Sequence, residues 1–139
     1  MIEIDNRTSL QIDESLLNQI SNSLTQKDIE LIITTPDEIQ TINNEYRGID
    51  KPTDVLSFPY EDMPMSPLGS IVISSSHVLE KAKELNHLPQ EEFSLLFIHG
   101  LLHLLGYDHE VDNGEMRQKE NQLIKRFNLP QSLIVRTQG

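Results

Sequence analysis

The chain has 139 residues, 37% of them hydrophobic and 24% charged, so we expect one compact domain over residues 1–139. Eleven basic residues stand against 22 acidic ones, and the net charge of −11 excludes broad, non-specific coating of nucleic acid. The absence of cysteine excludes disulfides, thiolate zinc sites and a cysteine nucleophile, so a bound metal must use His, Asp or Glu.

The first half of the chain alternates predicted strands and helices. Residues 2–5 alternate apolar and polar side chains, which is typical of a half-buried strand, and the β-branched residues 29–34 predict a second strand. Asp13 is a good N-cap for a helix whose apolar residues follow at helical spacing. Pro36 predicts the first turn of another helix, which we expect to end at Gly48.

The second half predicts two further strands and three further helices. The strands are expected over residues 54–58 and 71–74, and the helices over residues 78–85, 89–105 and 113–127. The whole pattern predicts an α+β fold with a mixed four-stranded sheet packed with about five helices.

Neither a membrane span nor a signal peptide is predicted. Residues 94–107 are free of formal charge, but 14 residues with two histidines are too short and too polar to span a bilayer. The N-terminus is acidic and mixed, unlike a secretory signal. We therefore expect a soluble cytoplasmic protein with no membrane partner.

Basic residues concentrate in residues 116–139, where five stand against one acidic residue. They are Arg117, Lys119, Lys125, Arg126 and Arg136. This basic tail is either a docking face for an anionic partner or a helix whose cations keep it solvated and offset its acidic neighbours.

The strongest chemical signal is the segment His99-Gly-Leu-Leu-His103-Leu-Leu-Gly106-Tyr-Asp-His109. His99 and His103 are four residues apart, so on a helix they project from one face and can clamp one metal ion. Gly106 can turn the chain after the helix and bring His109 to the same point. Three neutral imidazoles would hold one Zn²⁺ and leave a fourth position for water, which favours catalysis over a structural role.

Three other interpretations of the segment stay open. The histidines could satisfy hydrogen bonds within an apolar helix, or Asp108, Asp112 or Glu115 could fold over and close the fourth position. Zinc peptidases of related spacing have Glu where this chain has Gly100, so a peptidase would lack its general base here. Gly100 instead suggests room for a bulky anionic substrate near the metal.

Asp108 is a candidate for activating the water or fixing an imidazole tautomer, and equally a turn residue.

The remaining candidates are weaker. Arg47 precedes a loop and has a fork of donors suited to phosphate, although a lone arginine is more often a surface ion pair. His77 and His87 lack ligand spacing and are expected to be solvated residues near helix ends.

The histidine segment closely resembles the signature of the YbeY family of bacterial metal-dependent endoribonucleases, which act in ribosomal RNA maturation. The segments Tyr46-Arg-Gly-Ile-Asp-Lys-Pro-Thr-Asp-Val-Leu-Ser-Phe-Pro59 and Leu68-Gly-Ser-Ile-Val-Ile73 resemble two further family segments in the same order. Ser70 stands where the family usually has Asp. The resemblance implies zinc ligands at His99, His103 and His109 and a part in activity for Arg47.

Together with these residues, the resemblance implies zinc-dependent endonucleolytic cleavage of single-stranded RNA in ribosomal RNA maturation and ribosome quality control. Zinc would polarise a phosphoryl oxygen or supply hydroxide, and Arg47 would stabilise charge in the transition state. A ribosomal protein or GTPase is a possible partner. The alternatives are a zinc metalloprotease-like hydrolase and a non-enzymatic ribosome assembly factor with a structural metal.

Overall fold

The computed structural model describes residues 1–107 and 114–129. Its elements in chain order are β1 (Ile2–Asn6), α1 (Glu14–Leu24), β2 (Ile29–Thr34), α2 (Pro36–Arg47), β3 (Val55–Pro59), β4 (Gly69–Ser74), α3 (Ser75–Leu85), α4 (Pro89–Leu104) and α5 (Glu115–Arg126). In these residues no helix is both long and apolar enough to cross a membrane.

The four strands form one mixed sheet in the order β1-β2-β4-β3. The first three strands in that order are parallel, and β3 pairs antiparallel with β4 at the edge. With its five helices, this architecture confirms the predicted α+β fold with a mixed four-stranded sheet. The edge position of β3 is important because residues of this strand line the candidate site.

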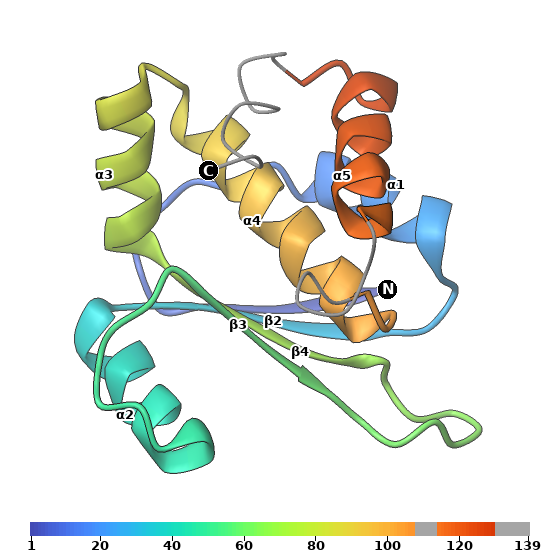
Figure 1. Ribbon diagram of the computed structural model, residues 1–139, viewed down its shortest axis with the longest axis horizontal. Coiled ribbons are helices and arrows are strands. Elements are labelled where there is room, and N and C mark those ends of the chain that lie inside the picture. Colours follow the sequence, from blue (N-terminus) through green and yellow to red (C-terminus); the bar gives the residue numbers. More distant parts are fainter. Residues whose placement is uncertain (108–113, 130–139) are drawn as a thin grey trace.

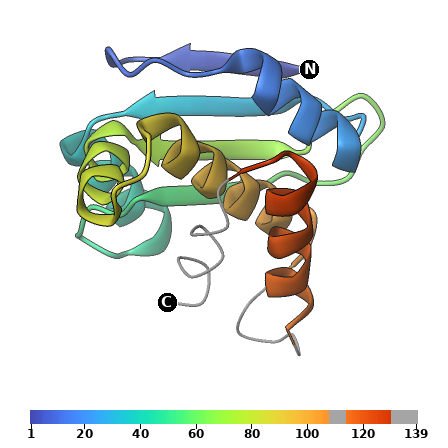
Figure 2. The ribbon, with the colours of Figure 1, turned by 90° about the horizontal axis from the view of Figure 1, so that it is seen from above.

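The helices cover the two faces of the sheet unequally. Figure 1 shows α1, α3, α4 and α5 on one face and α2 alone on the other, and Figure 2 shows the order of the strands from above. The larger core cluster packs the four-helix side against Ile29, Leu31, Ile71 and other inward residues of the strands. The smaller cluster packs Ile39 of α2 on the opposite face. This second face is therefore only partly covered.

Helix α4 is the central element of the larger layer. Pro89 occupies its first turn, and the Glu91 carboxylate accepts a 2.7 Å hydrogen bond from the Leu88 backbone N–H. Nearly every residue from Glu92 to Leu104 is buried, which explains why the apolar positions follow no single stripe. His99 and His103 are exceptions and remain partly exposed near its C-terminal end.

Gly100 allows α4 to approach the sheet closely. A Cβ atom built at this position would lie 2.9 Å from Cγ2 of Ile71 and 3.2 Å from Oγ of Ser57. The Ser57 hydroxyl also donates a 3.1 Å hydrogen bond to the Gly100 carbonyl. The expectation that Gly100 leaves room for substrate is therefore wrong, because the space beside it is filled by β3 and β4.

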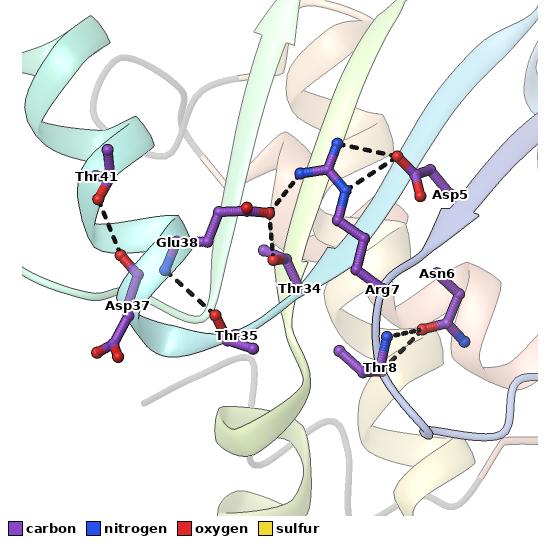
Figure 3. A network of polar contacts seen from close by, with 9 residues as sticks. All are labelled: Asp5, Asn6, Arg7, Thr8, Thr34, Thr35, Asp37, Glu38 and Thr41. Atoms are coloured by element: carbon purple, nitrogen blue, oxygen red, sulfur yellow. Dashed lines mark hydrogen bonds and ion pairs between the residues drawn. The ribbon is translucent and has the colours of Figure 1, made fainter.

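Helix α2 is anchored at its N-terminus by the polar network shown in Figure 3. The Thr35 hydroxyl accepts a hydrogen bond from the Glu38 backbone N–H, so it caps the helix. Hydrogen bonds from the Thr34 hydroxyl and from Arg7 to the Glu38 carboxylate keep the pKa of Glu38 below its usual value. Gly48 ends the helix in the left-handed conformation, as predicted, and Arg47 is the last helical residue.

Two expectations about the second half of the chain need correction. Helix α3 begins at Ser75, three residues before the predicted start, because polar serines and not apolar residues form its first turn. His87 is not a solvated residue. Its side chain is only 5% exposed, and its Nδ1 atom lies 3.7 Å from Oε2 of the buried Glu92.

Candidate metal and phosphate site

The two helical histidines converge as their spacing predicts. The Nε2 atoms of His99 and His103 lie 3.2 Å apart, and the two rings meet nearly edge to face. Two nitrogens bound tetrahedrally to one zinc ion at 2.0–2.1 Å would be about 3.3–3.4 Å apart. The observed separation therefore fits two ligands of a single metal ion.

A buried carboxylate on α5 orients the first of these histidines. The Nδ1 atom of His99 lies 3.3 Å from Oε1 of Glu120, and the residue Glu120 is only 1% exposed. A carboxylate accepts the proton of Nδ1, so the lone pair of the imidazole is on Nε2, which faces His103. This carboxylate–histidine arrangement is the usual support of a metal-binding imidazole.

Replacing Glu120 with glutamine should lower the affinity for Zn²⁺ about 10- to 100-fold, because a neutral amide supports the His99 imidazole less strongly. Competition with a chelator of known affinity measures this change. Glu80→Gln on α3 removes the same charge from an exposed position and should leave the affinity unchanged. Equal affinities in wild type and Glu120→Gln would show that Glu120 has only a packing role.

The histidines open into a pocket of about 600 Å³ beside the edge strand. Arg47 from the end of α2 lines the same pocket as His99 and His103, although it is distant from them in the sequence. The pocket is also lined by Thr53, Asp54, Val55, Leu56, Ser57, Pro59, Gly106 and Tyr107. An exposed guanidinium beside two potential metal ligands provides positive charge for an anionic substrate.

The carboxylate of Asp54 was missed by the sequence analysis, which considered Asp108 as the acid of the site. Oδ1 of Asp54 accepts a 2.8 Å hydrogen bond from the Val55 backbone N–H, and Asp54 lines the pocket. Its position as the first residue of a predicted strand, within a segment that resembles the family, was the available signal. Glu120 had no comparable signal because it is the one acid in a basic segment.

The turn after α4 follows the prediction as far as the structure describes it. Gly106 has a φ of 99°, which a residue with a side chain rarely adopts, and the chain then places Tyr107 in the pocket. Asp108 and His109 lie outside the described residues, as does Asp112. Within residues 1–107 and 114–129, no three potential metal ligands form a group.

Ser70 lies on the opposite face of the sheet from the histidines. Its hydroxyl contacts Oε2 of Glu30 at 3.1 Å and the hydroxyl of Tyr60. The pKa of the Tyr60 hydroxyl is raised, mainly because the side chain is partly buried. The hydrogen bond with Ser70 opposes this shift, and the interaction with Glu30 adds to it. Glu30 is the cross-strand partner of Ser70, so β2 supplies a carboxylate beside the position where the family usually has Asp.

The basic residues near the C-terminus lie mainly on α5. Arg117, Lys125 and Arg126 are exposed, and the Arg126 guanidinium lies 5.5 Å from the centre of the Phe127 ring. Arg136 lies outside the described residues. This placement is compatible with both interpretations of the basic tail.

The site combines two convergent imidazoles, a carboxylate that orients one of them and an arginine in the same pocket. These are features of metal-dependent hydrolases that act on anionic esters.

The comparisons with known proteins agree with this class. A family model described as "Endoribonuclease YbeY" matches residues 2–128. A protein of that name from Sulfurimonas denitrificans is 66% identical over the full length of both chains, and one from Helicobacter pylori is 55% identical over 99% of each. A solution structure from Thermotoga maritima is 31% identical, with a TM-score of 0.62 over 91% of this chain and 89% of that one.

The chain belongs to the YbeY endoribonuclease family. Membership confirms the resemblance found in the sequence and the prediction of a hydrolase that cleaves RNA phosphodiester bonds.

Proposed function

We propose that this endoribonuclease uses one Zn²⁺ ion to cleave single-stranded RNA during ribosomal RNA maturation and ribosome quality control in the cytoplasm. The observation that carries the proposal is the 3.2 Å approach of the His99 and His103 Nε2 atoms in a pocket shared with Arg47. The forked donors of Arg47 match the oxygens of a phosphodiester, which supports this substrate class.

The proposed ligands of the metal are His99, His103 and His109, with water in the fourth position. A zinc ion held in this way supplies Lewis-acid polarisation of a phosphoryl oxygen and a water of lowered pKa. Glu120 fixes the tautomer of His99 through Nδ1. These roles need no fourth protein ligand.

Arg47 is proposed to bind the scissile phosphate and to stabilise the additional negative charge that develops in the transition state. Its forked donors can contact two phosphate oxygens at once. Asp108, beside His109 in the sequence, is proposed to accept the proton of the attacking water or to orient that imidazole.

The acidic surface requires a local route for RNA. With a net charge of −11, the protein should bind RNA weakly and with steep salt dependence, through Arg47, Lys51 and the basic residues of α5. A ribosomal protein or a GTPase is proposed to deliver the substrate, because the protein itself attracts RNA only locally.

Assays of zinc-loaded and metal-free protein on single-stranded RNA and on casein test the proposal. We expect cleavage of RNA only, lost on chelation and restored by added zinc. Proteolysis without RNA cleavage would favour a peptidase. RNA cleavage that survives complete removal of the metal would refute the role given to zinc.

A further inference from the structure

Three of the seven aromatic side chains gather on the face of the sheet that α2 only partly covers. They are Tyr46 at the end of α2, Phe58 on β3 and Tyr60 immediately after β3. The ring centres of Tyr46 and Phe58 lie 5.4 Å apart with an interplanar angle of 56°. Tyr46 is 70% exposed and Tyr60 is 41% exposed. We refer to these three residues as the aromatic patch.

The exposure of Tyr46 is unusual for a large aromatic side chain. A large aromatic ring usually contributes to a core or an interface, since burying it removes much apolar surface from water. The ring of Tyr46 contacts the ring of Phe58, and this contact still leaves most of Tyr46 accessible to solvent.

The aromatic patch is continuous with the pocket. Arg47, which follows Tyr46 on α2, lines the pocket together with the histidines. Ser57 and Pro59, which flank Phe58, line it as well. Side chains alternate along a strand, so Phe58 points to the α2 face with the patch, while its neighbours Ser57 and Pro59 line the pocket at the same edge of the sheet. An RNA strand bound at Arg47 can therefore cross β3 and reach Tyr46.

The charges near the aromatic patch decide which part of a nucleotide fits there. The Tyr60 hydroxyl donates a 2.7 Å hydrogen bond to the carboxylate of Glu30, and Glu45 precedes Tyr46 on α2. Carboxylates repel a phosphate but not an uncharged base. A base on the aromatic patch would leave its phosphate on the Arg47 side, where the positive charge lies.

We infer that Tyr46, supported by Phe58, forms a stacking subsite for the base of a nucleotide adjacent to the phosphodiester bound at Arg47. This inference rests on the proposed function and specifies how the enzyme selects its RNA substrate. Every base has a π-face, so stacking selects single-stranded RNA, whose bases are accessible, without selecting one sequence. A paired base would have to leave its helix before it could reach Tyr46.

The test uses zinc-loaded protein and a short single-stranded RNA, either intact or with one abasic nucleotide placed in turn at each position around the cleavage site. Tyr46→Ala should lower kcat/KM on intact RNA about tenfold, whereas Tyr46→Phe, which keeps the ring, should change it less than about twofold. At one position, the abasic nucleotide should lower kcat/KM of wild type by the same factor of about ten. At that position it should not lower kcat/KM of Tyr46→Ala any further.

The control is Leu88→Ala. Leu88 is 64% exposed and lies at the N-terminus of α4, at the opposite end of that helix from the histidines, so its truncation should not affect cleavage. Melting temperatures of all variants should match wild type, because these side chains are largely exposed.

A second measurement separates this inference from the proposed function. The chain has no tryptophan and three tyrosines, so tyrosine fluorescence reports binding near these rings, and Tyr46→Phe isolates the contribution of Tyr46. A 2′-O-methyl oligonucleotide should quench wild type, and Tyr46→Phe should lose most of that quenching. Quenching without RNA cleavage would refute the proposed function and keep the subsite. Cleavage with neither quenching nor coupling to an abasic position would refute the subsite and point to a protein-docking role for the patch.

Discussion

His103→Ala should lose its zinc and lower the rate of RNA cleavage by about 10³-fold or more. The substitution removes Nε2 of His103, which lies 3.2 Å from Nε2 of His99. One of the two convergent metal ligands is therefore lost. A metal ion contributes several kcal/mol to the stabilisation of charge in a transition state, and each 1.36 kcal/mol corresponds to a factor of ten in rate. Metal analysis of the purified variant and single-turnover cleavage of a short RNA measure the two effects separately.

The matched control is His77→Ala on α3. The Nδ1 atom of His77 is 2.7 Å from the Ser74 hydroxyl, and His77 does not line the pocket. This variant should keep one zinc ion per chain and cleave RNA at the wild-type rate. A His103→Ala protein that still bound one zinc ion and cleaved normally would contradict the site.

Arg47→Ala should lower the rate of RNA cleavage about 10²- to 10³-fold while zinc remains bound, since a donor placed where charge develops commonly contributes that much. Arg47 lies at the exposed end of α2, so its truncation should not unfold the protein. The measurements are kcat and KM on RNA together with the zinc content. Arg47→Lys should give an intermediate rate, because lysine keeps the charge but lacks the planar fork.

Arg117→Ala on α5 provides a comparison of equal charge. If Arg47 only attracted RNA over a distance, both variants would be impaired alike, and added salt would abolish the difference from wild type. If the basic tail were instead the docking face of an assembly factor, Arg117→Ala would be the more damaging change. We expect Arg47→Ala to be far more damaging to kcat, at every salt concentration.

Much of the fold could be predicted because local signals and tertiary packing agree. β2 has the bounds predicted for it, and α2 begins at Pro36 and ends before Gly48 as expected. The start of α3 was missed because its first turn is polar and follows directly from β4. Residue patterns identify apolar faces well, but they do not identify a polar turn that the end of a strand holds in place.

The site was predicted in part for a similar reason. The relation of His99 to His103 is local, since helical spacing fixes it, and the structure reproduces it. The pairing of His99 with Glu120 and the packing of Gly100 against Ile71 depend on how α5 and the sheet meet α4. Such long-range contacts leave no spacing rule in the chain. For this reason Glu120 was overlooked and Gly100 was misinterpreted.

The edge strand β3 has one hydrogen-bonded neighbour in the sheet, yet it borders both the pocket and the aromatic patch. Detachment of this single strand would remove the wall of the pocket and the support of Tyr46 together, and would break the contact of Ser57 with α4. The pocket and the aromatic patch therefore depend on one common support, the pairing of β3 with β4.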